Sequence, residues 1–137
     1  MKTLKLTIAV IALLFIGVAA NASSKKVTSN DVVNTYINAI STGKTQGLDG
    51  ILDSEMQFNT KRGDNITTID KNSFLDFLEK NGSSAAPLNT STTVMQEDDN
   101  IQKIKVEFKY DGFVRSDVLT LNHTNGWVIT NITSTTK

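Results

Sequence analysis

The spacing of apolar residues changes once along this chain, from every third or fourth position to every second position. From residue 101 to 110 the sequence IQKIKVEFKY alternates, which is typical of a strand with one buried and one solvated face. Asp111-Gly112 is a tight hairpin signal, and the sequence HTNG at 123–126 indicates a second turn. Together with a strand at 90–96, these segments predict an antiparallel meander in the C-terminal half.

Helical spacing comes before this meander. Residues 28–43 predict a helix that Thr28 or Ser29 caps and Gly43 ends. Its apolar face is expected to carry Val32, Val33, Tyr36, Ile37 and Ile40. A weaker helix, interrupted by glycines, is expected at 45–55, with Leu48, Ile51 and Leu52 buried.

A third helix is predicted from Asp70, its cap, to Asn81-Gly82, and a short strand is expected just upstream in MQFNT. This helix should bury Phe74, Leu75, Phe77 and Leu78. Helices followed by a strand meander indicate a single α+β domain.

The first 22 residues have the pattern of a secretory signal peptide. Lys2 and Lys5 precede an apolar run at 6–18, and Ala20-Asn21-Ala22 offers small residues for cleavage. The run has about 13 residues, whereas a membrane-spanning helix needs roughly 20. We therefore expect a cleaved segment at 1–22 and one domain at 23–137, exported to the periplasm or secreted, with no membrane association after cleavage.

The composition limits which classes of partner and cofactor are expected. The chain has no cysteine, so neither a disulfide nor a lipid anchor on cysteine is expected. Removing Lys2 and Lys5 from 14 basic residues leaves 12 against 14 acidic residues, and no basic stripe remains for nucleic acid. The sequence has no phosphate-binding glycine loop and no cluster of metal ligands, so neither a cofactor nor a metal is expected.

The order and spacing of four segments resemble the nuclear transport factor 2-like superfamily. These segments are YINAISTGK, MQFNT, SFLDFLEK and GWVITNI. More narrowly, the chain is similar to the exported bacterial branch labelled SnoaL-like or lumazine-binding. The resemblance implies a cone, in which a curved antiparallel or mixed sheet wraps about three N-terminal helices around a pocket. It also implies a homodimer formed through the outer face of the sheet.

Within that superfamily, ketosteroid isomerases use a helix tyrosine, a late-strand acid and a carboxylate that moves the proton. The resemblance places Tyr36 and Asp117 at the first two positions. Asn59 stands at the third, and an amide cannot act as that base. We therefore expect a non-catalytic domain that binds a small, partly apolar molecule. A dehydratase or isomerase, or an interaction module with a filled cone, remains the alternative.

Arg115 and Asp117 share a strand face with Phe113, Leu119 and Leu121. One interpretation is an ion pair at the cone mouth or in a dimer interface. The other is a polar clamp in an apolar pocket, which requires Asp117 to be buried and partnered.

The predicted pocket residues combine this pair with aromatic side chains. They are Tyr36, Phe58, Phe74, Arg115, Asp117 and Trp127. Phe77, Phe108 and Tyr110 are further candidates, although plain packing explains each of them more simply.

The single histidine and the single tryptophan lie four residues apart around the last turn. His123 is expected in solvent at the hairpin tip, because no cysteine or acid adjoins it as a metal ligand. The resemblance implies that Trp127 begins the last strand as a core residue, and alternation then places Ile129 and Asn131 on the same face. This segment is predicted to be scaffold.

Overall fold

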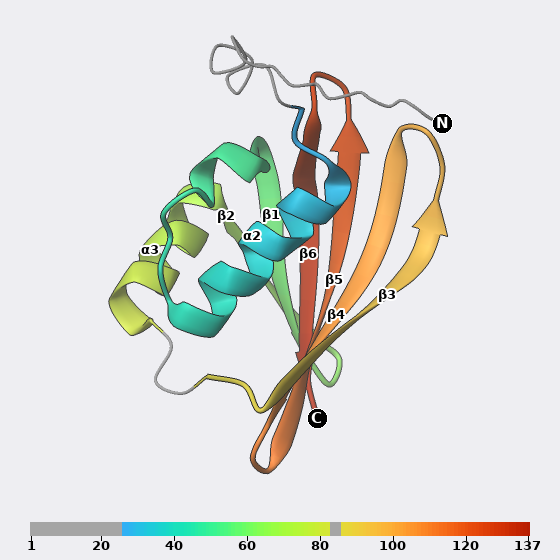
Figure 1. Cartoon of the computed structure of the whole chain (residues 1–137). Coiled ribbons are helices and arrows are strands. Elements are labelled where there is room, and N and C mark those ends of the chain that lie inside the picture. Colours follow the sequence, from blue (N-terminus) through green and yellow to red (C-terminus); the bar gives the residue numbers. More distant parts are fainter. Residues whose placement is uncertain (1–25, 83–85) are drawn as a thin grey trace, which may run out of the picture.

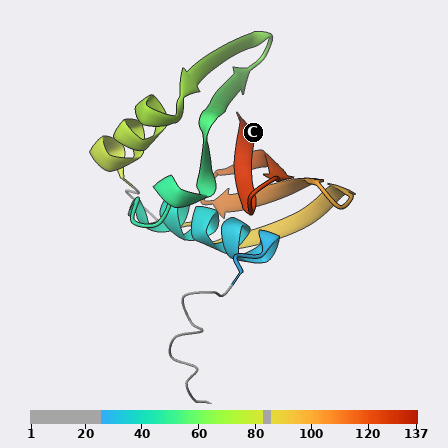
Figure 2. The same ribbon diagram turned by 90° about the horizontal axis from the view of Figure 1, so that it is seen from above.

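The computed structural model describes residues 26–82 and 86–137. The predicted signal segment at 1–22 lies outside the described residues. Figure 1 shows one curved sheet with helices on its concave side, and Figure 2 shows the same curvature from above. The elements are α2 (Ser29–Thr42), η2 (Asp49–Ile51), β1 (Leu52–Arg62), β2 (Asn65–Asp70), α3 (Lys71–Asn81), β3 (Asn89–Glu97), β4 (Ile101–Tyr110), β5 (Phe113–His123) and β6 (Trp127–Thr136).

The sheet has six strands in the order β2-β1-β6-β5-β4-β3. Strands β3 to β6 form the predicted antiparallel meander, whereas β1 pairs in parallel with β6. The sheet is therefore mixed, and β6 lies between the β1–β2 hairpin and the three antiparallel strands β5, β4 and β3. Helix α2 packs against β6, while α3 packs against β1 and β2.

Helix α2 begins and ends where the sequence predicts. The hydroxyl of Thr28 accepts a hydrogen bond from the Asp31 amide at 3.1 Å, and the Asp31 carboxylate accepts one from the Thr28 amide at 2.9 Å. This reciprocal pair is a capping box. At the other end Gly43 adopts a left-handed conformation with φ of 75°.

Helix α3 also starts at its predicted cap. Asp70 accepts a hydrogen bond from the Ser73 amide at 2.9 Å, and this bond lowers the pKa of Asp70. Phe74 and Leu78 are buried, but the prediction for Phe77 is wrong, because its side chain is 51% exposed. Phe74 and Leu78 are one turn apart on the stripe that faces β1 and β2, and Phe77 lies to one side of that stripe.

The helix predicted at 45–55 does not form. Gly47 has a positive φ of 84° within a turn, and only the short 3₁₀ helix η2 follows. From Leu52 the chain is already strand, because β1 pairs there with β6. The expectation of three N-terminal helices is thus corrected to two α-helices among the described residues.

Strands β4 and β5 confirm the predicted alternation, whereas β6 requires a correction. In β4, Ile104, Val106 and Phe108 are buried on the inner face. In β6 the register shifts beside Thr120 and Leu121, so both Ile129 and Ile132 face inward. The extra residue of this bulge places Asn131 on the outer face, and it does not share a face with Ile129 as the simple alternation predicted.

The core fills the concave side of the sheet. Its largest fully buried aromatic side chains are Tyr36, Phe74 and Phe108. Phe58 stacks on Phe74 with ring centroids 4.5 Å apart. Across residues 26–82 and 86–137, no helix is both long and apolar enough to span a bilayer.

Candidate functional site

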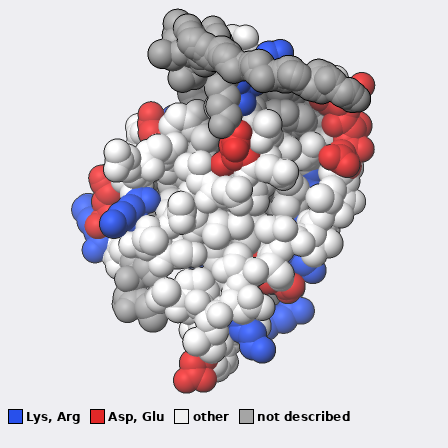
Figure 3. Space-filling model, in the orientation of Figure 1, with Lys and Arg blue, Asp and Glu red and all other residues white. Residues whose placement is uncertain are grey.

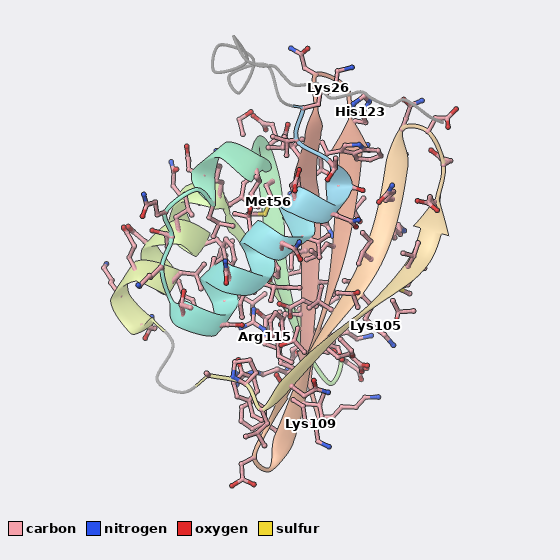
Figure 4. The ribbon with its side chains drawn as sticks, viewed as in Figure 1. Lys26, Met56, Lys105, Lys109, Arg115 and His123 are labelled. Atoms are coloured by element: carbon pink, nitrogen blue, oxygen red, sulfur yellow. The ribbon has the colours of Figure 1, made fainter. Side chains whose placement is uncertain are left out.

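Three polar side chains meet beneath α2. The Tyr36 hydroxyl donates a hydrogen bond to Oδ2 of Asp117 at 2.6 Å. Arg115 approaches the same carboxylate with Nε at 2.9 Å from Oδ1 and Nη2 at 2.9 Å from Oδ2. Figure 4 labels Arg115 just below α2, beside the lower part of the sheet. Asp117 is therefore buried and partnered, as the polar-clamp interpretation requires.

The fold explains why these groups meet. Arg115 and Asp117 are two residues apart on β5, so both side chains face inward. Tyr36 lies in the middle of the buried stripe of α2, which crosses this part of the sheet. Asp117 accepts from both partners, so it acts as a carboxylate whose charge Arg115 offsets.

The titration properties of the cluster follow from burial and charge. Burial, and then the neighbouring Asp117, raise the pKa of Tyr36 well above its usual value. Burial acts to lower the pKa of Arg115, but Tyr36 and Asp117 outweigh it and raise that pKa. At neutral pH the phenol is therefore protonated and the guanidinium is charged.

Arg115 connects this buried cluster to an open cleft. Its side chain is 21% exposed, and its guanidinium carbon lies 5.9 Å from the Phe108 ring centroid. The cleft has a volume of about 470 Å³ and lies between α3 and the β4–β5 hairpin. Its lining comprises Ile40, Phe77, Leu78, Asn81, Gly82, Ala86, Leu88, Tyr110, Asp111, Phe113 and Arg115.

The walls of the cleft are mainly apolar. Tyr110 and Phe113 flank the hairpin turn and stack with centroids 4.7 Å apart. Phe77 and Leu88 lie at its rim, and Leu88 is 72% exposed. In the view of Figure 3, charged side chains lie mainly along the margins of the face that carries the helices.

The predicted pocket residues fall into three groups. Tyr36 and Asp117 join Arg115, which alone of the six lines the cleft. Phe58 and Phe74 pack in the core instead.

Trp127 lies at the opposite end of the molecule, near the labelled His123 in Figure 4. Its ring is tilted against His123 at 4.9 Å, and it also packs on the core. His123 is exposed at the end of β5, as expected.

Sequence reasoning missed Leu88 and Phe113 as lining residues. A usable signal existed for Phe113, because it directly opposes Tyr110 across a two-residue turn and such pairs contact each other. Leu88 lies in a loop and carries no periodic signal.

Asn59 does not belong to the site. It follows the buried Phe58, so its side chain points to the outer face of the sheet. There its amide donates to Asn131 at 3.0 Å, and its oxygen accepts from Thr68 at 2.7 Å. The Tyr36 hydroxyl, in the site itself, donates to Asp117.

The described residues contain no group of three or more acids or histidines that could hold a metal ion.

The sequence profile of a family described as "Putative lumazine-binding" matches residues 24–133. The chain belongs to this family. No curated protein sequence matches this lumazine-binding family member.

Solved structures show the fold of this family member to be NTF2-like. An NTF2-like protein of unknown function from Silicibacter pomeroyi DSS-3 has a TM-score of 0.64 at 16% identity, covering 87% of this chain and 98% of the other. A second, from Methylobacillus flagellatus KT, has a TM-score of 0.61 at 19% identity, covering 79% and 88%. A DUF4783 family protein from Bacteroides ovatus ATCC 8483 has a TM-score of 0.57 at 13% identity, covering 72% and 89%.

Proposed function

We propose that this chain is an exported, non-catalytic domain that binds a small, partly apolar molecule in the cleft between α3 and the β4–β5 hairpin. The observation that carries the proposal is the meeting of exposed apolar side chains with one fixed cationic donor, Arg115. Ligand sites commonly combine apolar walls with a few well-placed polar groups.

The exposed apolar surface supports this choice of site. Phe77 is 51% exposed, Leu88 72% and Phe113 43%, and all three line the same cleft. Such residues are ordinary when scattered, but a cluster of them around a concavity indicates a surface that another molecule covers.

The rigidity of Arg115 supports it further. The guanidinium is held by hydrogen bonds to Asp117, which Tyr36 holds in turn. A donor whose position is already fixed loses little conformational entropy when a ligand arrives. Tyr36 and Asp117 therefore hold Arg115 in position without lining the cleft themselves.

The family description supports a small flat ligand as the first candidate. Lumazine is a fused two-ring heteroaromatic compound with two carbonyl groups. Its aromatic face suits the wall formed by Tyr110 and Phe113, and a carbonyl oxygen suits Arg115.

The first experiment is native mass spectrometry on protein recovered from its exporting host, followed by titration with lumazine. A mature mass that begins near Ser23 would support export. A bound mass that is lost on denaturation, or saturable lumazine binding, would support the ligand site. An uncleaved chain would contradict the first part of the proposal.

A matched pair of variants locates the binding. Leu88→Ser removes an exposed aliphatic side chain from the cleft, whereas Val94→Ser removes one from the middle of β3, where Val94 is 57% exposed. We expect Leu88→Ser to weaken binding by roughly tenfold, as a side chain of this size contributes 1–3 kcal/mol. Equal affinities for the two variants would contradict this location.

We also propose that the domain forms a homodimer through the outer face of the sheet. Lys105, Val118 and Thr133 lie side by side on that face, across the adjacent strands β4, β5 and β6. The convex surface of these three adjacent strands can pair with its own copy about a two-fold axis.

A further inference from the structure

The charges around the cleft restrict the chemistry of its ligand. Of the residues that line it, Arg115 and Asp111 carry formal charges. Asp117 lies directly behind Arg115, with carboxylate oxygens 2.9 Å from Nε and Nη2. One positive charge is thus accompanied by two negative ones.

Arg115 nevertheless keeps a donor for a ligand. Its contacts with Asp117 use Nε and Nη2. Nη1 takes no part in them, and the side chain is 21% exposed where it lines the cleft. A hydrogen bond from a charged donor to a neutral acceptor is short and strong, and it needs no net charge on the ligand.

We infer that the ligand is an uncharged molecule with a flat apolar body and a carbonyl-like acceptor directed at Arg115, and that the cleft discriminates against carboxylates. This inference rests on the proposed function, and it names the class of ligand for the same site.

The electrostatic reason is the distance dependence of the Coulomb energy. A ligand carboxylate touching Nη1 would gain attraction from Arg115. The Asp117 carboxylate, 2.9 Å from Nε and Nη2 on the same guanidinium, would repel it, since the Coulomb energy falls only with the inverse of distance. Asp111 at the cleft adds a second repulsion. The carboxylate would also lose part of its hydration, a cost that a carbonyl group largely escapes.

The stacked aromatic pair accounts for the flat body. The rings of Tyr110 and Phe113 stack on each other at an interplanar angle of 14°, and a planar ligand ring can extend such a stack from its outer face. Burial raises the pKa of Tyr110, so its hydroxyl keeps its proton beside the cleft. A planar ring stacked there can direct one acceptor toward Arg115, which lines the same cleft.

The test compares isosteric ligands that differ in charge: benzamide with benzoate, 2-naphthamide with 2-naphthoate, and indole-3-carboxamide with its carboxylate. Dissociation constants come from calorimetry at neutral pH and low salt, and backbone NMR shifts locate the binding. We expect each amide that binds to have a dissociation constant at least about tenfold lower than that of its matching carboxylate.

Two variants separate the cause. Asp111→Asn removes the negative charge at the cleft. It should reduce the ratio of carboxylate to amide dissociation constants by about threefold. Asp99→Asn removes the same charge from the exposed turn before β4, outside the cleft lining, and should leave the preference unchanged.

Carboxylates that bind as tightly as the amides, or an amide preference that Asp111→Asn leaves unchanged, would overturn the inference while the cleft remained a binding site. If no member of any pair shifts the resonances of cleft residues, the proposed function itself is overturned.

Discussion

Asp117 is the residue on which the interior of this protein depends most. It is fully buried, and its charge is offset by Arg115 alone among its hydrogen-bond partners. A buried carboxylate that loses its cation retains the cost of its desolvation without the compensating attraction. Removing the Arg115 guanidinium should therefore lower the free energy of unfolding more than removing the Tyr36 hydroxyl.

Arg115→Met is expected to destabilise the protein by about 3–5 kcal/mol, because it leaves the Asp117 charge buried and uncompensated. The double variant Arg115→Met/Asp117→Leu should recover much of this loss, since the charge is then removed as well. Urea unfolding followed by Trp127 fluorescence measures both. A single variant within about 0.5 kcal/mol of the parent would show that Asp117 is not held as a charge.

Tyr36→Phe should cost about 1.5–3 kcal/mol at neutral pH, the contribution of a hydrogen bond to a charged group. Its effect should also depend on pH. Burial raises the pKa of Tyr36 in the folded state, so the unfolded state releases this proton first, near pH 10. The stability that Tyr36 contributes is therefore complete below pH 10 and is lost as the pH rises toward the folded pKa.

The measurement is the difference in unfolding free energy between the parent and Tyr36→Phe from pH 7 to 11. Tyr110 is present in both proteins, so its own titration cancels. A difference that stays constant above pH 10 would contradict the assigned shift.

At the scale of elements, local chemistry made the helix ends predictable. The caps of α2 at Thr28 and Gly43, and of α3 at Asp70, each rest on a side chain or a glycine within the same turn. Alternation in β4 was equally readable, because one face of that strand is buried.

Features that depend on distant strands were not predictable. Leu48, Ile51 and Leu52 have helical spacing, but pairing with β6 draws Leu52 into β1. The bulge in β6 likewise reverses the inward and outward alternation between Ile129 and Asn131. No alternation rule applied to the sequence detects such a shift. At the site, the Arg115–Asp117 pair was predictable because both residues lie on one strand. The cleft was not, because a helix, a loop and a hairpin form it together.

Two glycines of the N-terminal half provide a matched test of helix termination. Gly43 has a φ of 75°, so Gly43→Ala should destabilise by about 1 kcal/mol. Gly50 lies in η2, and an added Cβ would meet nothing within 4 Å, so Gly50→Ala should be neutral or stabilise by up to about 1 kcal/mol. Thermal unfolding compares them, and equal shifts would contradict the role of Gly43.

At the scale of the whole molecule, the proposed dimer can be tested on the outer face of the sheet. Val118 follows the buried Asp117, so it points outward from the central strand β5. In a two-fold interface, Val118→Glu would bring like charges from both copies together. Light scattering should then report a monomer.

The control is Asn72→Glu, which adds the same charge to an exposed position of α3 and should leave the dimer intact. A parent protein that is monomeric at the highest accessible concentration would contradict the dimer directly.

The position of β6 has a consequence for biosynthesis. Strand β6 is made after the other five strands and joins β1 to β5, so the β1–β2 hairpin and the three strands β3 to β5 have no common sheet until it arrives. A ribosome must therefore deliver five strands before the sixth can unite them, and contacts this distant in sequence form slowly. Helix α3, which packs on β1 and β2, can therefore take its place beside the β4–β5 hairpin only after β6 has been synthesised.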